Sequence, residues 1–127
     1  MTDQELIEQA FEARQKAYAP YSKFQVGAAC IDRAGNLFTG ANMENASYGL
    51  TVCAERVALW KAHSEACEPI LKIAVVAEVS EGPVRPCGAC RQVLAELAPD
   101  ATVIMANTAG EQESKTVDQL LPLAFHW

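Results

Sequence analysis

Three cysteines and one glutamate have the types and spacing of a metal-dependent catalytic centre. Cys53 and Glu55 are separated by one residue, and Cys87 and Cys90 form a C-x-x-C pair directly after Pro86. A C-x-x-C pair at the start of a helix can direct both sulfurs to one metal ion, as in many zinc sites. The positive end of the helix dipole also lowers the pKa of a thiol and so favours the metal-binding thiolate.

The number of ligands favours a catalytic zinc site over a structural one. Cys53 is expected to begin one helix and Cys87 another, so the two helix ends can point at a common centre. Three thiolates without a fourth protein ligand leave one position for water, whereas structural zinc sites are closed by four side chains. Three thiolates also outweigh the charge of the metal, and Arg56 together with the helix dipoles can offset part of that excess.

Glu55 is the candidate proton carrier. It lies two residues from a predicted ligand, close enough to reach a zinc-bound water without coordinating the metal. A carboxylate there can take the proton of the water and pass it to a substrate nitrogen. This chemistry suits hydrolytic loss of ammonia from an amidine-like carbon. Zinc nucleobase deaminases have the related layout H-x-E with P-C-x-x-C, and Cys53 stands here in the histidine position.

A C-x-x-C pair alone can also be a structural zinc half-site or a redox pair. A structural zinc module needs a fourth Cys or His. A thiol oxidoreductase that uses Cys87 and Cys90 gives no reason for Cys53 and Glu55, and a catalytically inactive zinc-binding or assembly protein gives none for Glu55. The remaining two cysteines need no such site: Cys30 lies in an apolar run and is expected to be buried. Cys67 is expected to be a spare thiol.

The elements around these motifs predict an α/β fold. Asp32-Arg33-Ala34-Gly35 separates two apolar runs, a hairpin signal, so the first two strands are expected to be antiparallel. Strand–helix–strand crossovers make at least one later pair parallel, which gives a mixed sheet between helices. Pro20 is expected to stop the first helix. Helices are predicted over 3–17, 53–66, 87–97 and 117–121, and strands over 24–31, 36–41, 71–79, 101–106 and 112–116.

Composition excludes several classes of protein. With 127 residues, half of them hydrophobic, the chain is expected to form a single domain, 1–127. The net charge of −6 would repel a polyanion, so no nucleic acid partner is expected. No segment approaches the roughly 18 apolar residues of a membrane span, so no membrane partner is expected either. The acidic N-terminus predicts a cytoplasmic protein, in which a disulfide framework is improbable.

Several further blocks of the sequence resemble the small homotetrameric type of cytidine deaminase. They occur in that family's order and extend over nearly the whole chain, which is far more specific than one C-x-x-C pair. The blocks are residues 19–24, 26–29, 42–48, 53–56, 86–92 and 120–122, followed by Phe125.

The resemblance implies a three-layer α/β/α sandwich around a five-stranded mixed sheet, with one Zn²⁺ per subunit held by Cys53, Cys87 and Cys90. It implies hydrolytic deamination of cytidine and deoxycytidine to the uridine products in pyrimidine salvage. In that mechanism zinc-bound hydroxide attacks C4 of the cytosine, while Glu55 carries protons to N3 and to the departing ammonia. The alternative is a related small deaminase of another cytosine nucleoside, such as blasticidin S.

The resemblance also implies which residues bind the nucleoside. Asn42 and Glu44 would hydrogen-bond the ribose hydroxyls, and they favour a ribose-bearing substrate over blasticidin S. Phe24 would pack against the pyrimidine ring, and the backbone N–H of Ala54 would contact the base carbonyl. The residues alone leave simpler roles open, since Phe24 is also suited to a strand core and the other side chains to a solvated loop.

Tyr48 and Phe125 match the family positions through which neighbouring subunits complete each site of a homotetramer. For Tyr48 the alternative from the residues alone is ordinary packing within a loop. His63 is expected to be solvated, and His126 to be exposed or at a subunit contact.

Overall fold

A five-stranded mixed sheet forms the centre of the computed structural model, which describes residues 1–66 and 68–127. The strands lie in the order β2-β1-β3-β4-β5. β1 pairs antiparallel with both β2 and β3, β3 pairs parallel with β4, and β4 pairs antiparallel with β5. The predicted mixed sheet is therefore confirmed. The strands are β1 (Val26–Asp32), β2 (Leu37–Ala41), β3 (Ile70–Ala77), β4 (Thr102–Asn107) and β5 (Gln112–Thr116).

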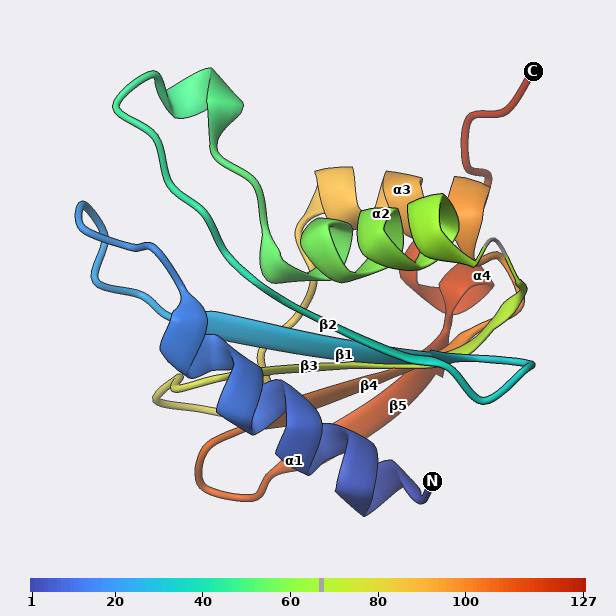
Figure 1. The fold of residues 1–127 in the computed structure, drawn as a ribbon, viewed down its shortest axis with the longest axis horizontal. Helices are drawn as coiled ribbons and strands as arrows, with labels where there is room; N and C mark the ends of the chain where they lie inside the picture. The colour runs from blue at the N-terminus through green and yellow to red at the C-terminus, as the bar shows by residue number, and fades with distance from the viewer. Residues whose placement is uncertain (67) are drawn as a thin grey trace.

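Helices cover both faces of the sheet, which gives the three layers that were predicted (Figure 1). α1 packs on one face through Leu6, Ile7 and Ala10, while α2 and α3 lie on the other. None of the helices in the described ranges has the length and apolar character that a membrane crossing requires. The helices are α1 (Asp3–Ala13), α2 (Ala54–Glu65), α3 (Gly88–Leu97) and α4 (Val117–Leu120).

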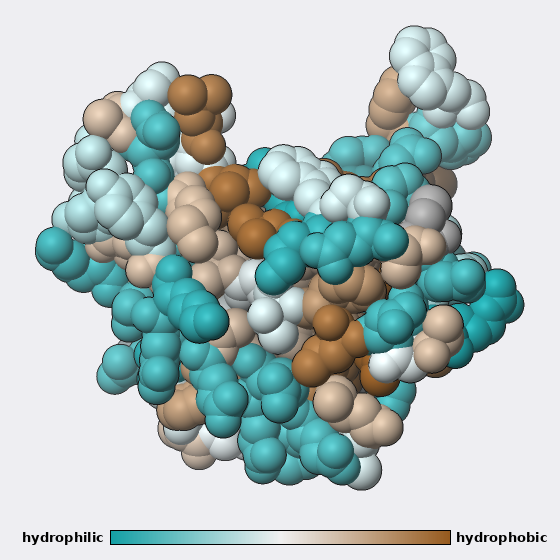
Figure 2. Space-filling view, viewed as in Figure 1, coloured by the Kyte–Doolittle hydropathy of each residue, from teal (hydrophilic) through white to brown (hydrophobic). Residues whose placement is uncertain are grey.

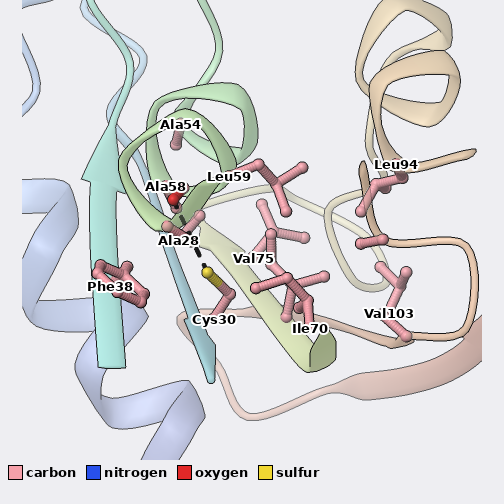
Figure 3. Packing of buried hydrophobic residues seen from close by; sticks show 14 of the residues in the cluster. Ala28, Cys30, Phe38, Ala54, Ala58, Leu59, Ile70, Val75, Leu94 and Val103 are labelled. Carbon is pink, nitrogen blue, oxygen red and sulfur yellow. Dashed lines mark hydrogen bonds between the residues drawn. The ribbon is translucent and has the colours of Figure 1, made fainter. Parts of the chain in front are cut away.

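The core between α2 and the sheet contains one of the five cysteines (Figure 3). Cys30 is fully buried, as predicted, and its sulfur lies 3.8 Å from the carbonyl oxygen of Ala58 in α2. Burial raises the pKa of this thiol to about 12, so it stays protonated and packs as a small apolar side chain. Cys67, the predicted spare thiol, lies outside the described residues.

The first helix ends earlier than predicted. α1 stops at Ala13, a short 3₁₀ turn follows over Arg14–Lys16, and Ala17 is already extended, well before Pro20. Long-range pairing explains the difference. Tyr18 forms an isolated bridge with Met43: its N–H donates to the carbonyl oxygen of Asn42 at 2.9 Å. This pairing draws the chain out of the helix toward the loop after β2 and overrides the proline signal.

Two glycines let helices approach the sheet more closely than any side chain would permit. A Cβ at Gly27 would lie 1.9 Å from the carbonyl oxygen of Ala10 in α1. A Cβ at Gly40 in β2 would lie 2.6 Å from the carbonyl oxygen of Ala54 and 2.6 Å from the nitrogen of Ala58. Gly40 therefore sets how closely the first turns of α2 approach the sheet.

We expect Gly40→Ala to lower the free energy of unfolding by about 1–3 kcal/mol, because backbone atoms of α2 would have to move. Urea denaturation measures this change. Gly49→Ala is the matched control, since nothing lies within 4 Å of a Cβ there, and we expect a change within about 0.5 kcal/mol. Equal stability of the two variants would show that α2 has room to shift.

Candidate active site and metal centre

The two helix starts bring the three predicted metal ligands together. Cys53 is the N-cap residue of α2, Cys87 is the N-cap residue of α3, and Cys90 lies in the first turn of α3. The three sulfurs all lie within 4.8 Å of one another, and the Cys53 and Cys87 sulfurs are 3.7 Å apart. Neither N-cap sulfur is used as a helix cap. Both are therefore available as ligands.

The spacing of the sulfurs fits zinc. Tetrahedral ligation with Zn–S distances of about 2.3 Å places neighbouring sulfurs about 3.8 Å apart, close to the separation of Cys53 and Cys87. Within the described ranges, no other group of three His, Cys, Asp or Glu side chains is placed to hold a metal. The group has three protein ligands, as an open catalytic site requires.

The thiols oppose one another's ionisation when no cation lies between them. A hydrogen bond from the thiol of Cys90, together with one from Arg56, lowers the pKa of Cys53 to about 5. The same bond to Cys53, with burial, raises the pKa of Cys90. A first thiolate thus makes loss of a second proton harder. A divalent ion removes this conflict, because it stabilises each thiolate directly.

Arg56 lies where it can offset the negative charge of the sulfurs. Its Nη2 donates to the sulfur of Cys53 at 3.4 Å. Its Nε is buried and has no hydrogen-bond partner among the described residues. The guanidinium is thus directed at the cysteine cluster, where its charge can offset part of the negative charge of the thiolates.

Glu55 is almost completely removed from solvent, with 4% of its surface exposed. It lies in the first turn of α2, two residues from Cys53. Burial raises the pKa of its carboxyl to about 7, and the negative charge of Cys53 adds to the effect. A carboxyl with such a pKa can take up and release a proton near neutrality, which is what a proton carrier does.

A small cavity of about 190 Å³ connects Glu55 with residues from distant parts of the chain. Its walls are largely apolar, as suits a small aromatic ring, while a carboxyl and two sulfurs supply the chemistry. The sequence analysis gave no role to the residues just before Cys53 and Cys87, yet Thr51, Val52, Val84 and Arg85 line the cavity. Their position next to the two motifs is the only sequence feature that could have indicated this role. The lining residues are Phe24, Val26, Asn42, Thr51, Val52, Cys53, Glu55, Val84, Arg85 and Cys87.

Asn42 holds one wall of this cavity in place. Its buried amide accepts a hydrogen bond from the N–H of Val26 and donates one to the carbonyl oxygen of Phe24, both at 2.8 Å. Phe24 precedes β1 instead of beginning it, and 40% of its surface stays exposed. It is therefore a cavity wall residue and not part of the strand core.

Glu44 lies in a neighbouring cavity of about 440 Å³, which shares Thr51 with the first. Its carboxylate is bound by the hydroxyl of Ser22 and accepts hydrogen bonds from the N–H groups of Tyr21 and Ser22 at 3.0 and 3.1 Å. The Ser22 hydroxyl contributes most to holding the pKa of Glu44 below its usual range, so this side chain is ionised and fixed in direction. Asn42 and Glu44 thus line two adjoining cavities.

Tyr48 and Phe125 do not reach the small cavity within one chain. Tyr48 lies on the 3₁₀ turn Tyr48–Leu50, contacts the ring of Tyr21 edge-on at 6.3 Å and is 78% exposed. Phe125 is 69% exposed, and its carbonyl oxygen accepts a hydrogen bond from Gln92 at 3.0 Å. The segments that carry them project beyond α2 and α3 at opposite ends of the molecule, with a hollow between them (Figures 1 and 2).

Comparison with known proteins agrees with this arrangement. The profile of the cytidine and deoxycytidylate deaminase zinc-binding region matches residues 1–106. A cytidine deaminase of Halalkalibacterium halodurans is 56% identical over 126 residues, which are 98% of this chain and 95% of that protein. A cytidine deaminase of Sporosarcina psychrophila is 48% identical over 98% of this chain and 92% of its own length.

Solved structures lead to the same family. The crystal structure of cytidine deaminase from Burkholderia pseudomallei has a TM-score of 0.95 and 51% identity, with 98% of this chain and 100% of that chain covered. The cytidine deaminase of Mycobacterium tuberculosis has a TM-score of 0.83 and 35% identity over 100% of both chains. The predicted α/β sandwich is confirmed, the match to a zinc-binding region supports the zinc cofactor, and Cys53, Cys87 and Cys90 are positioned to bind a metal ion. The chain belongs to the cytidine and deoxycytidylate deaminase family.

Proposed function

We propose that this protein is a zinc-dependent cytidine deaminase that converts cytidine and deoxycytidine to uridine and deoxyuridine with release of ammonia, in pyrimidine salvage. One observation carries the proposal: the buried carboxyl of Glu55 lines the same small cavity as Cys53 and Cys87, two of the three clustered cysteines. Curated relatives that match nearly the whole chain are named cytidine deaminases, which disfavours the blasticidin S alternative.

Cys53, Cys87 and Cys90 hold the metal in this proposal, and Arg56 offsets part of the thiolate charge. When bound, Zn²⁺ acts as a Lewis acid that lowers the pKa of a coordinated water and so supplies a nucleophile at neutral pH. Glu55 would take one proton from that water and deliver it to N3 of the cytosine as the water oxygen bonds to C4. It would then take the second proton from the oxygen on C4 and give it to the amino group, which leaves as ammonia when the C4–N bond breaks. Its burial keeps this exchange apart from bulk water.

The walls of the cavity bind the base. Phe24 offers its exposed ring to the pyrimidine. Ala54 is the first residue of α2, so its N–H has no partner within the helix and is available to the base carbonyl. The buried amide of Asn42 holds the backbone of Phe24 in position. The close approach of α2 to Gly40 does the same for the backbone of Ala54.

Asn42 and Glu44 bind the ribose hydroxyls in this proposal. The amide of Asn42 keeps a second N–H and a second lone pair after its two bonds to the backbone. The carboxylate of Glu44 is oriented by Tyr21 and Ser22, so little entropy is lost when a hydroxyl donates to it. A free cytosine base has neither hydroxyl and would leave both groups partly desolvated and unpaired, whereas deoxycytidine keeps its 3′-hydroxyl as a partner.

We also propose a cytoplasmic homotetramer of single-domain chains, in which neighbouring subunits supply Tyr48 and Phe125 to each site. Support comes from the large apolar side chains that the isolated chain exposes on its two projecting segments, since contiguous exposed apolar surface marks protein contacts. Besides the two aromatic residues, they include Leu50, Leu123 and Trp127.

Glu55→Gln tests the catalytic proposal. We expect the variant to keep the zinc content of the parent and to lose about 10²- to 10⁴-fold in kcat, because the amide cannot carry a proton. The readouts are metal analysis and the ultraviolet absorbance of cytidine, deoxycytidine, cytosine and blasticidin S. Glu65→Gln, at the exposed end of the same helix, is the control and should match the parent. Deamination of cytidine by Glu55→Gln at the parent rate would refute this role.

Mixed assemblies test whether sites are shared. Phe125→Ala and Glu55→Gln chains are each expected to be impaired. In a randomly mixed tetramer, about a quarter of the sites would combine an intact Glu55 with an intact Phe125 from a neighbour, if each site takes one of each. We therefore expect activity to reappear when the two variants are co-expressed. Activity no higher than the mean of the two separate variants would show that each chain uses its own Phe125.

A further inference from the structure

Arg91, the residue after Cys90, makes contacts that the zinc motif does not explain. Its side chain turns back along α3, and its Nε donates to the carbonyl oxygen of Pro86 at 2.8 Å. Its Nη1 donates to the carbonyl oxygen of Leu120 at 2.9 Å. Pro86 directly precedes Cys87, and Leu120 is the last residue of α4. One guanidinium thus joins the metal-binding segment to a helix from the end of the chain.

Both of these carbonyl oxygens lie where a helix supplies no donor. Pro86 is buried but precedes α3, and the last carbonyls of α4 have no partner within that helix. Buried backbone carbonyls are nearly always hydrogen-bonded, because leaving one unpaired is costly. The planar guanidinium presents two donors in a fixed geometry, which the single ammonium of a lysine does not reproduce.

The backbone of Arg91 strengthens this contact. Its N–H donates to the carbonyl oxygen of Cys87 at 3.0 Å, so Arg91 holds two consecutive carbonyls, one through its backbone and one through its side chain. Because peptide units are planar, fixing both carbonyls fixes the direction of the chain at Cys87. Cys87 needs such support more than Cys90 does, since Cys87 is exposed and Cys90 is fully buried in the core.

We propose that Arg91 is a positioning residue of the zinc centre. By tying the peptide before Cys87 to the end of α4, it holds the Cys87 sulfur beside the other two sulfurs. The inference rests on the proposed function in that the three cysteines bind zinc. Arg91 acts through Cys87, and outer contacts of this kind commonly account for about 10- to 100-fold in metal affinity.

Zinc release from the loaded full-length protein tests the inference. The rate of zinc transfer to a chromogenic chelator is measured for the parent, Arg91→Met and Arg91→Lys. We expect release from Arg91→Met to be about 10- to 100-fold faster than from the parent. Arg91→Lys should lie between them, because an ammonium can keep one of the two carbonyl bonds.

Lys115→Met is the matched control. Lys115 lines the same cavity of about 470 Å³ as Arg91, so the variant removes a nearby cation and leaves both carbonyl bonds intact. We expect it to release zinc at the parent rate. Urea unfolding of the zinc-free proteins reports separately on any general loss of stability.

Two outcomes overturn the inference, and they are distinguishable. Zinc release from Arg91→Met at the parent rate, even with lowered stability of the zinc-free protein, would show that Arg91 has only a structural role. If Arg91→Met does not fold, zinc release from Arg91→Lys at the parent rate would overturn the inference in the same way. A parent protein that binds no zinc would instead refute the proposed function, and this inference with it. An active, zinc-bound parent leaves the Arg91 variants to decide.

Discussion

The crowding of three cysteine sulfurs at two helix starts is the constraint on which the rest of the site depends. Three sulfurs within 4.8 Å of one another cannot all be thiolates without a cation between them, and the opposite pKa shifts of Cys53 and Cys90 reflect that conflict. The helix starts and Arg56 supply only partial compensation. A divalent ion held by Cys53, Cys87 and Cys90 would resolve the conflict and would join the start of α2 to the start of α3.

Other features of the fold keep this arrangement in place. Gly40 lets α2 lie close on β2, which sets the depth of Glu55 behind the cavity. The hydrogen bonds of Asn42 join the segment before β1 to the end of β2, and so place Phe24 in the wall of the cavity that Glu55 of α2 also lines. On the other side, the bonds of Arg91 join the start of α3 to α4. The catalytic chemistry is local, but the geometry that supports it draws on both ends of the chain.

Local patterns made the metal centre and most elements predictable from the sequence. The ligands and Glu55 lie in two short motifs at helix starts, where spacing alone constrains geometry, and the hairpin around Gly35 has a distinct turn signature. Contacts between distant segments had no such signature. The bridge between Tyr18 and Met43 ended the first helix early. The hydrogen bond from the Arg91 side chain to the carbonyl oxygen of Leu120 likewise depends on how α4 is placed, which no local pattern encodes.

X-ray absorption at the zinc edge of the isolated protein tests the central claim most directly, because it counts the ligands of the metal. The account predicts three sulfur neighbours at about 2.3 Å and one oxygen or nitrogen neighbour at about 2.0 Å. Four sulfur neighbours would indicate a closed structural site and would contradict the account. So would fewer than three sulfurs, since the metal would then not be held by Cys53, Cys87 and Cys90 together.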